Sequence, residues 1–229
     1  MGSGIEIVYQ DEFLLAINKP AGLLSIRDGY DASLPYPSKL LEKEFGRLWV
    51  VHRLDRGTSG ILLLARTPEC HRALNDAFES RRVKKLYHAI VAGSPAWSEF
   101  LAEMPLLVNG DRRHRTVISP GRGKPARTGL LVLQRGRLYT LVEAHPFTGY
   151  THQIRAHLSA LGIPILSDPL YGAPSKSLSS PVQDNLCPVP ITRLALHAWT
   201  IEFVHPFTSL DMSLSAPYPD DFKSALEQI

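Results

Sequence analysis

The sequence lacks most of the features that identify secreted and membrane-bound proteins. It has only two cysteines among 229 residues. Cys70 and Cys187 lie too far apart for a CxxC pair, so we expect neither a disulfide framework nor a zinc site. No apolar run reaches the ~18 residues that span a bilayer, and the start, MGSGIEIVYQ, has no secretory pattern. We therefore expect a cytoplasmic protein without a bound metal or a membrane anchor.

The common motifs of hydrolases and nucleotide-dependent enzymes are also missing. The Gly57–Gly60 segment, GTSG, does not have the spacing of a GxSxG elbow, and His152 and His157 do not form HExxH. There is no P-loop and no GxGxxG. These absences argue against serine hydrolysis, zinc catalysis and nucleotide-dependent chemistry. With 44% hydrophobic residues and no repeats, the 229 residues are enough for one large globular domain or two small ones.

Positive charge is concentrated in two segments, although the net charge is only +3. Residues 81–85, RRVKK, hold four cations in five positions. Residues 111–137 hold eight cations against one acid, Asp111. These eight are Arg112, Arg113, Arg115, Arg122, Lys124, Arg127, Arg135 and Arg137. Such clusters are typical of polyanion binders, but solvated loops and hairpin edges would look the same.

Hydrophobic periodicity predicts an α+β fold with a mainly antiparallel, mixed sheet core and flanking helices. Thr67 and Pro68 begin a predicted helix over 68–81, and a second is expected from Thr151 to Leu161, ended by Gly162. Residues 173–190 are rich in serine and proline and suggest a surface excursion. Strands are expected at 5–9, 13–17, 61–65, 86–92, 128–134, 138–145, 194–204 and 210–215, the last two closing the chain.

The segment HRLDRGTSGILLLAR (52–66) places one carboxylate, Asp55, between Arg53 and Arg56. The turn residues that follow lead into the continuously apolar run 61–65, which is typical of a strand buried on both faces. A carboxylate can act as a nucleophile when it is ionised, oriented and accessible. From spacing alone, the residues favour a structural turn aspartate with an arginine partner over a catalytic Asp55.

Four ordered segments carry a resemblance to a known family. HRLDRGTSGILLLAR is similar to the signature of RluA-type RNA pseudouridine synthases. NKPAGLLS (18–25) resembles the N-terminal motif of that family, KKLYHAIVAG (84–93) its tyrosine-bearing strand, and TGYTHQIRAHLSALGIPILSDPLYG (148–172) its TGRxHQIR segment, which LHA (196–198) continues. The resemblance implies the pseudouridine synthase fold, with a motif-bearing core over 18–215. Some members of the family also carry an S4 domain, but none fits before residue 18, so we expect residues 1–229 to form a single catalytic domain. The resemblance also implies an isomerase that converts uridine in ribosomal RNA or tRNA to pseudouridine without a cofactor.

The resemblance also assigns three catalytic residues. Asp55 matches the catalytic aspartate, which attacks the base at C6 or the ribose at C1′. Tyr87 matches the active-site tyrosine, which packs against the target base and helps to remove the C5 proton. Arg155 matches the basic residue that pairs with the aspartate and keeps it anionic, a task suited to a guanidinium. Without these motifs, Tyr87 would be read as a sheet-core aromatic and Arg155 as a helix-surface cation.

Candidate RNA contacts surround these three positions. Arg53 is placed to fill the space left by an extruded uridine or to hold a flanking phosphate. Lys84 and the cluster at 112–115 would follow the backbone phosphates. RNA is expected to be recognised by loops at 28–47, 109–127 and 173–190. The complete set of candidate contacts is Arg53, Arg56, Thr58, Lys85, Arg127, Tyr150, His152 and Gln153.

Two positions depart from the family pattern. Tyr150 stands where the family usually carries arginine, which removes a cation and puts the RNA contacts in doubt. Ser167 replaces a glycine, which is a small loop change. A catalytically idle RNA-binding or RNA-folding protein on the same fold is the alternative, and Tyr150 gives it some support. An aspartate-dependent glycoside hydrolase lacks a second carboxylate at a recognisable spacing. The chain is expected to act as a monomer.

Overall fold

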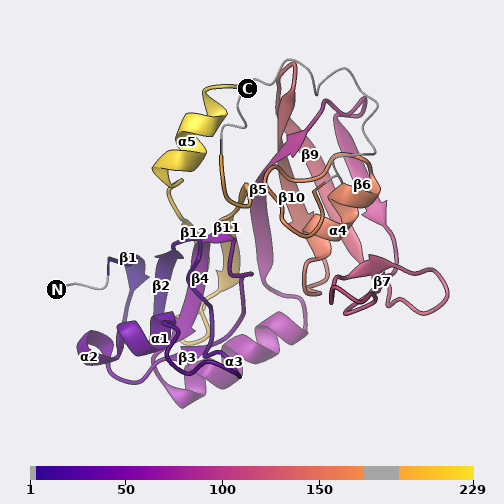
Figure 1. Ribbon diagram of the computed structural model, residues 1–229. Helices are drawn as coiled ribbons and strands as arrows, with labels where there is room; N and C mark the ends of the chain where they lie inside the picture. Colours follow the sequence, from indigo (N-terminus) through magenta and orange to yellow (C-terminus); the bar gives the residue numbers. More distant parts are fainter. Residues whose placement is uncertain (1–3, 173–190) are drawn as a thin grey trace. The chain divides into compact units, whose positions relative to one another are not determined.

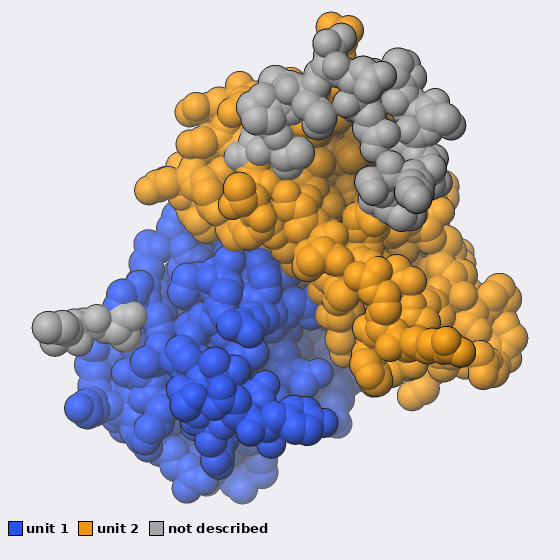
Figure 2. Space-filling model, viewed as in Figure 1, with its two compact units in different colours: residues 1–86, 197–218 blue, residues 87–196, 219–229 orange. Residues whose placement is uncertain are grey.

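The computed structural model describes residues 4–172 and 191–229, so the predicted excursion at 173–190 lies outside the described residues. The chain divides into two compact units (Figure 2). Unit 1 comprises residues 1–86 and 197–218, and unit 2 comprises residues 87–196 and 219–229. The prediction of one catalytic domain over 1–229 concerns how the two units act together and stays a prediction.

Unit 1 is built around strand β4, Ser59–Ala65 (Figure 1). All seven residues of this strand are buried. β4 pairs antiparallel with β2 (Leu14–Lys19), which pairs with β1 (Glu6–Gln10). It also pairs antiparallel with β3 (Trp49–Val50) and parallel with β11 (Leu196–Val204). β12 (Asp211–Ser215) is antiparallel to β11. The apolar run at 61–65 is therefore a fully buried strand, as predicted.

Helix α3, Pro68–Glu79, packs against β4 and β3. The Thr67 hydroxyl accepts a hydrogen bond from the Cys70 N–H at 3.1 Å, and Pro68 fills the first turn. This cap satisfies one of the N–H groups that a helix start leaves open. Cys70 and Leu74 are fully buried, and burial raises the pKa of the Cys70 thiol to about 12. The predicted helix and its cap are confirmed, with an end two residues earlier than expected.

The segment between β2 and β3 contains two helices of one turn each that the sequence did not predict. They are α1 (Pro37–Leu40) and α2 (Glu42–Phe45). Both fall within 28–47, one of the segments expected to recognise RNA. Tyr36 precedes α1 in an extended conformation, and Pro37 occupies the first turn, a position that suits proline because its missing N–H is not needed there.

Unit 2 contains an antiparallel sheet in the order β5-β10-β9-β6 (Figure 1). β5 (Lys84–Ala92) begins in unit 1, and the boundary between the units falls within it. The β9–β10 hairpin confirms the prediction made for 128–134 and 138–145. The hairpin consists of β9 (Arg127–Arg135) and β10 (Tyr139–Pro146). The edge strand β6 (Glu99–Glu103), which the sequence did not predict, pairs with β9.

Helix α4, Gln153–Ala160, packs against β8, β9 and β10. A two-stranded ribbon of β7 (Leu106–Leu107) and β8 (Val117–Ile118) precedes it in the chain. The helix predicted from Thr151 to Leu161 is confirmed with narrower bounds: it begins at Gln153, after His152 with φ of 57°, and ends at Ala160. The chain ends in helix α5 (Asp220–Leu226), so the prediction that strands close the chain is wrong. α5 begins after Pro219 and buries Phe222 and Ala225.

The α+β prediction is confirmed: the strands are mainly antiparallel, with a parallel β4–β11 pair that makes the sheet mixed. Among the described residues, no helix is both long and apolar enough to cross a membrane.

Candidate active site

Asp55 lies in a turn that leads directly into β4. The Thr58 N–H donates to the Asp55 carbonyl at 3.0 Å and closes the turn. Asp55 is half-buried, whereas Thr58 is only 2% exposed. The two neighbouring arginines, Arg53 and Arg56, are exposed. The carboxylate of Asp55 therefore sits on a short, closed segment of backbone that is anchored by a fully buried strand.

The loop at 18–25 is hydrogen-bonded to the chain on both sides of Asp55. Before it, the Ser25 hydroxyl donates to the Leu54 carbonyl at 2.8 Å and accepts from the Leu54 N–H at 3.0 Å. After it, the Gly22 N–H donates to the Arg56 carbonyl at 2.7 Å, and Arg56 Nε donates to the Gly22 carbonyl at 3.0 Å. These four bonds hold the backbone of Asp55 from two directions, which is how a nucleophile is kept oriented.

Lys19 stabilises the loop itself. Its side chain is fully buried, and Nζ donates to the carbonyls of Pro20 at 2.9 Å and Leu23 at 2.8 Å. Gly22 has φ of +88°, a conformation that L side chains rarely adopt. The loop at 18–25 therefore supports the Asp55 turn. Sequence reasoning missed this role, and only the family resemblance of NKPAGLLS could have signalled it.

His52 and Lys85 lie close enough to each other for their charges to interact. His52 Nε2 accepts a hydrogen bond from the Leu63 N–H at 3.0 Å, and its ring stacks on Phe78 with centroids 4.8 Å apart. Burial, together with the positive charge of Lys85, lowers the pKa of His52 to about 3. Burial also lowers the pKa of Lys85. His52 is thus neutral at physiological pH and helps to hold β4 in place.

Tyr87 and Arg155 belong to unit 2. Tyr87 is half-buried on β5, opposite Ala144 of β10. Arg155 lies on α4 and is 5% exposed. Its Nε donates to Asp168 Oδ2 and its Nη2 to Asp168 Oδ1, both at 2.8 Å. The guanidinium also lies 5.0 Å from the centroid of the Tyr171 ring. Arg155 is therefore a buried, bidentate ion-pair partner, the geometry for which arginine is suited.

Asp168 is ionised within this arrangement. Burial on its own would raise the pKa of the carboxyl, but the hydrogen bonds and charge of Arg155 outweigh it, and the pKa lies below its usual range. The N–H groups of Leu170 and Tyr171 also donate to Oδ1, at 2.9 and 3.1 Å. Sequence reasoning did not identify Asp168 as a partner of Arg155. The predicted pairing of Arg155 with Asp55 stays a prediction.

The predicted RNA contacts at the start of α4 have different environments. Gln153 is 4% exposed. It accepts from the Thr148 hydroxyl at 2.7 Å and the Tyr150 N–H at 3.2 Å, and donates to the Arg127 carbonyl and the Thr128 hydroxyl, both at 2.9 Å. These four bonds use the side-chain amide to hold the turn before α4. An RNA contact of Gln153 is untested.

Tyr150 and His152 flank the same turn. Tyr150 is half-buried and packs against a buried cluster of Leu106, Ala126, Ala156 and Tyr171. His152 Nδ1 lies 3.2 Å from the Tyr171 hydroxyl. Arg127 lies on β9, where its Nε donates to Glu103 at 2.7 Å and its guanidinium lies over the Phe147 ring at 5.4 Å. The contact of Tyr150 with the buried cluster is apolar packing, which an arginine at position 150 would not supply in the same way.

Each unit therefore holds a distinct part of the predicted site. Unit 1 carries Asp55 with Arg53, Arg56, Thr58 and Lys85. Unit 2 carries Tyr87, Arg155, Arg127, Tyr150, His152 and Gln153. Within the described ranges, no group of three or more histidine, cysteine or acidic side chains could hold a metal ion. A backbone-held carboxylate and a buried arginine are the groups on which acid–base or nucleophilic chemistry could be built.

Comparison with known proteins gives consistent matches over most of the chain. A family model described as RNA pseudouridylate synthase matches residues 13–160. An uncharacterised RNA pseudouridine synthase of Zymomonas mobilis is 38% identical over 223 residues, which is 94% of each chain. The dual-specificity RNA pseudouridine synthase RluA of Escherichia coli is 34% identical over 212 residues, which is 92% of each chain.

Solved structures agree with this result. Human RNA pseudouridylate synthase domain containing 4 aligns with a TM-score of 0.77 and 26% identity, covering 97% of this chain and 92% of its own. Human RNA pseudouridylate synthase domain containing 1 aligns with a TM-score of 0.76 and 29% identity, covering 95% of this chain and 84% of its own.

Proposed function

Because the chain belongs to the family of RNA pseudouridylate synthases, we propose that Asp55 is the nucleophile with which it acts on RNA. The protein is an RNA pseudouridine synthase, an isomerase. In this reaction the bond between N1 of uracil and C1′ of ribose breaks and a bond between C5 and C1′ forms. The base must detach, turn and lose its C5 proton, so the enzyme needs a group that holds one fragment while the other moves.

A carboxylate can do this by forming a temporary covalent bond to C6 of the base or to C1′ of the ribose. The observation that carries the assignment is the support of Asp55: four hydrogen bonds from the loop 18–25 fix the residues on either side of it. We assign to Tyr87 the packing against the base and assistance in removing the C5 proton. Arg155 is proposed to keep Asp55 anionic. The proton lost from C5 is balanced by a proton gained at N1, so substrate and product have the same composition and no cofactor is required.

The test is tritium release from RNA that carries 5-tritiated uridine. Asp55→Asn and Asp55→Ala should lower release by at least about a thousandfold, because a missing nucleophile is not replaced by its neighbours. Asp211→Asn is the matched control, since Asp211 is an exposed carboxylate at the start of β12 in the same unit and should keep full activity. Full activity in both Asp55 variants would refute the assignment.

The RNA target is proposed to be ribosomal RNA or tRNA. One similar protein, 33% identical over 231 residues, is the ribosomal large subunit pseudouridine synthase D of Zymomonas mobilis, and the Escherichia coli relative is named as dual-specificity. Mapping pseudouridine in a strain that lacks this gene, against its parent, should reveal one or a few missing sites. Loss of none in either RNA class would contradict the proposal.

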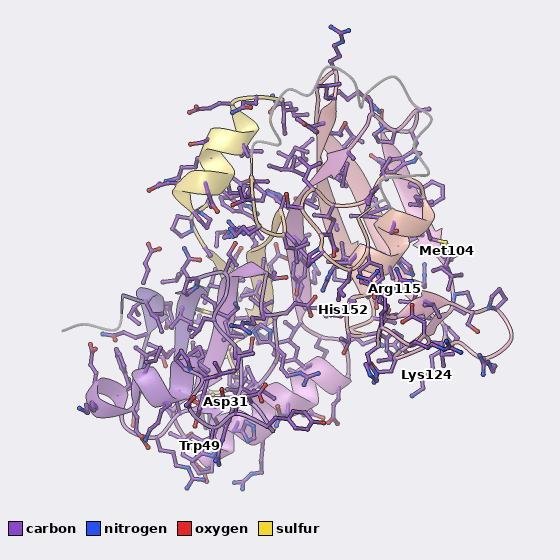
Figure 3. The ribbon with its side chains drawn as sticks, in the orientation of Figure 1. Asp31, Trp49, Met104, Arg115, Lys124 and His152 are labelled. Atoms are coloured by element: carbon purple, nitrogen blue, oxygen red, sulfur yellow. The ribbon has the colours of Figure 1, made fainter. Side chains whose placement is uncertain are left out.

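Exposed cations are proposed to bind the RNA backbone. Arg53 and Arg56 flank Asp55, and Arg112, Arg122 and Lys124 are exposed on the segment around β7 and β8, where Figure 3 labels Lys124. Contacts of this kind make binding strongly dependent on salt.

We also propose that the enzyme acts as a monomer in the cytoplasm and without a metal. Light scattering of the purified protein, with and without a chelator present, would test the monomeric state and its independence of metal.

A further inference from the structure

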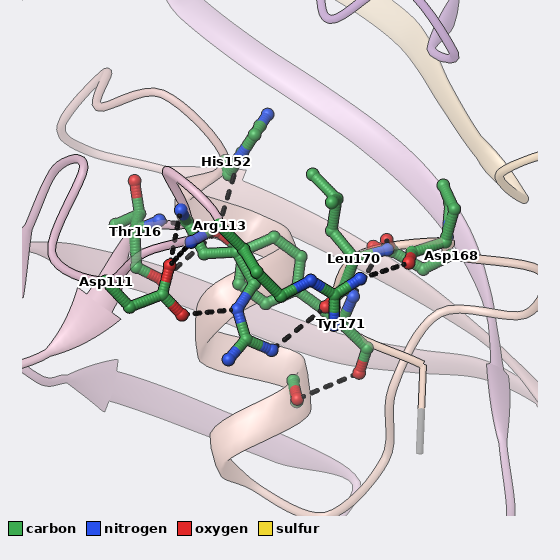
Figure 4. A network of polar contacts seen from close by, with 10 residues as sticks. Asp111, Arg113, Thr116, His152, Asp168, Leu170 and Tyr171 are labelled. Atoms are coloured by element: carbon green, nitrogen blue, oxygen red, sulfur yellow. Dashed lines mark hydrogen bonds and ion pairs between the residues drawn. The ribbon is translucent and has the colours of Figure 1, made fainter. Parts of the chain in front are cut away.

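A second network of polar contacts joins the loop at 109–116 to the helix that carries Arg155 (Figure 4). Tyr171 is its centre. The Tyr171 hydroxyl accepts from the Thr116 N–H at 2.7 Å and donates to the Thr116 carbonyl at 3.1 Å. The same hydroxyl lies 3.2 Å from Nδ1 of His152, and the Thr116 hydroxyl donates to the Thr151 carbonyl at 2.6 Å. One buried ring thus connects the loop to the start of α4.

The loop has its own internal support, which depends on Asp111. Its Oδ1 accepts the N–H groups of Arg113 and Arg115, both at 3.0 Å. Its Oδ2 accepts Arg115 Nε at 2.7 Å. The pKa of Asp111 is lowered, chiefly by the hydrogen bonds from the N–H and the side chain of Arg115, which outweigh the opposing effect of burial; the N–H of Arg113 lowers it further. Removing this carboxylate would therefore leave three donors without the acceptor that shapes the loop.

The loop in turn holds the backbone beside Asp168. Arg115 Nη1 donates to the Leu170 carbonyl at 3.0 Å, and Arg113 Nη2 donates to the Pro169 carbonyl at 3.1 Å. The Arg115 guanidinium also lies 5.9 Å from the centroid of the Tyr171 ring. Two arginine side chains thus bind the carbonyls of the two residues that follow Asp168 in the chain.

This backbone determines where the carboxylate of Asp168 lies. The N–H groups of Leu170 and Tyr171 donate to its Oδ1, and both carboxylate oxygens bind Arg155. A displacement of residues 169–171 would carry Asp168 with it, and Arg155 would follow because a bidentate pair fixes both position and orientation. The contacts therefore run without a gap from Asp111 through Arg115 and Leu170 to Asp168 and Arg155.

We propose that Asp111 and Arg115 are positioning residues that fix the guanidinium of Arg155. The role of Arg155 in catalysis rests on the proposed function. The positioning of its guanidinium by Asp111 and Arg115 rests only on the contacts described above. A displacement of about 1 Å at a catalytic group costs about a hundredfold in rate, so this support matters to an enzyme that depends on Arg155. Both residues lie within the basic cluster at 111–137, where sequence reasoning assigned Arg115 only to phosphate binding.

The experiment compares two aspartates that each bind an arginine in unit 2. Asp111→Ala removes the acceptor from the loop. Asp221→Ala is the matched control, because Asp221 binds Arg193 Nε at 2.6 Å and Nη2 at 2.8 Å, and among the described residues neither of these bonds involves a residue of the network. The readout is the Nε–Hε signal of Arg155 in protein labelled with nitrogen-15 and without RNA, identified by its disappearance in Arg155→Lys. Its rate of exchange with solvent reports how firmly the pair with Asp168 is held.

Exchange of the Arg155 proton should become at least about tenfold faster in Asp111→Ala and should change less than twofold in Asp221→Ala. Equal rates in Asp111→Ala and wild type would overturn the proposal. If Asp111→Ala does not fold, Arg115→Lys replaces it under the same criterion, since lysine keeps the charge but cannot bind Asp111 and Leu170 together.

Turnover separates this proposal from the proposed function. In single-turnover reactions at saturating RNA, Asp111→Ala should be about tenfold or more slower than wild type, with little change in apparent affinity, because Arg155 acts in the chemical step. Faster proton exchange with an unchanged rate would leave the positioning role intact and refute the catalytic role of Arg155. An unchanged exchange rate together with a slower reaction would refute the positioning role, because the loop would then affect the reaction by another route.

Discussion

Gly60 provides the sharpest test of how β4 is held, because a side chain at this position has no room. The residue pairs with Ala198 of the parallel strand β11. A Cβ atom added to Gly60 would lie 2.2 Å from the Ala198 carbonyl oxygen and 2.7 Å from its nitrogen. Its φ of +114° lies in a region that L side chains rarely adopt. Gly60→Ala therefore requires both a strained backbone and a separation of the two strands.

Two effects lower the free energy of unfolding of the Gly60→Ala variant. A backbone conformation that favours glycine costs about 1–3 kcal/mol for another residue. Separating the strands also weakens the buried hydrogen bond between Ser59 Oγ and His197 Nδ1, now 2.9 Å long, for about another 1–3 kcal/mol. The total of about 2–6 kcal/mol corresponds to a fall in Tm of roughly 4–24 °C, at about 2–4 °C per kcal/mol for a chain of this size.

Thermal unfolding followed by circular dichroism measures this fall. Gly121→Ala is the matched control, because a Cβ there meets no atom within 4 Å and its φ is not in the region reserved for glycine. The control should change stability by no more than about 0.5 kcal/mol. If Gly60→Ala melts within about 2 °C of Gly121→Ala, β11 does not approach β4 as closely as described, and the proposed cause of the glycine requirement is wrong.

Two further predictions concern stability. His52 has a pKa near 3 in the fold and 6.5 when unperturbed, so the unfolded chain binds the proton more tightly. Stability should therefore fall between pH 6.5 and about 3, by about 1.4 kcal/mol per pH unit. This slope should be flatter in His52→Gln, and an identical pH dependence in wild type and variant would contradict it. Thr67→Ala should cost about 1 kcal/mol by loss of the α3 cap, as measured by urea unfolding, while Thr67→Ser should cost much less; equal losses would argue against the cap.

Elements whose signals are local could be predicted from the sequence. The α3 helix has its cap, its proline and its apolar face within a few residues of one another, and the structure shows all three. The run at 61–65 could be identified as a buried strand because every residue in it is apolar. The β9–β10 hairpin was likewise predictable, since two alternating segments flank a glycine-containing turn.

Elements that depend on distant contacts could not be predicted in this way. β6 reads EFLAE and has four exposed residues of five, a pattern without a clear apolar face, and it is a strand because it pairs with β9. The parallel pairing of β4 with β11 joins residues that are far apart in the chain. Helix α5 is short and carries two buried side chains, too few for a reliable helical period.

The candidate site shows the same division. The motif resemblance predicts Asp55, Tyr87 and Arg155 as the catalytic residues, but the contacts that support Asp55 and Arg155 are long-range. The hydrogen bonds from Ser25 to Leu54 cross 29 positions. The bonds between Arg155 and Asp168 join α4 to a turn beyond it. Nothing in the sequence around Ser25 or Asp168 signals these roles, because hydroxyls and carboxylates occur in most turns.

The basic cluster at 111–137 shows why charge counted along a sequence overstates the charge available to RNA. Four of its eight cations are used within the fold. Arg115 binds Asp111, Arg127 binds Glu103, Arg113 binds the Pro169 carbonyl, and Arg135 binds the carbonyls of Pro95 and Trp97. The other four side chains, for which the described residues supply no partner, belong to Arg112, Arg122, Lys124 and Arg137.

This division changes what the cluster can contribute to RNA binding. Each phosphate contact adds about 0.7–0.9 to the slope of log affinity against log salt. Eight contacts would therefore add about 6, whereas four add about 3. A guanidinium that already binds a carboxylate must exchange that carboxylate for a phosphate. It therefore gains less free energy from binding RNA than a cation without such a partner. The arginines with partners thus help to hold the loops in place, and we expect the four cations without a partner among the described residues to contribute most of the salt dependence of this cluster.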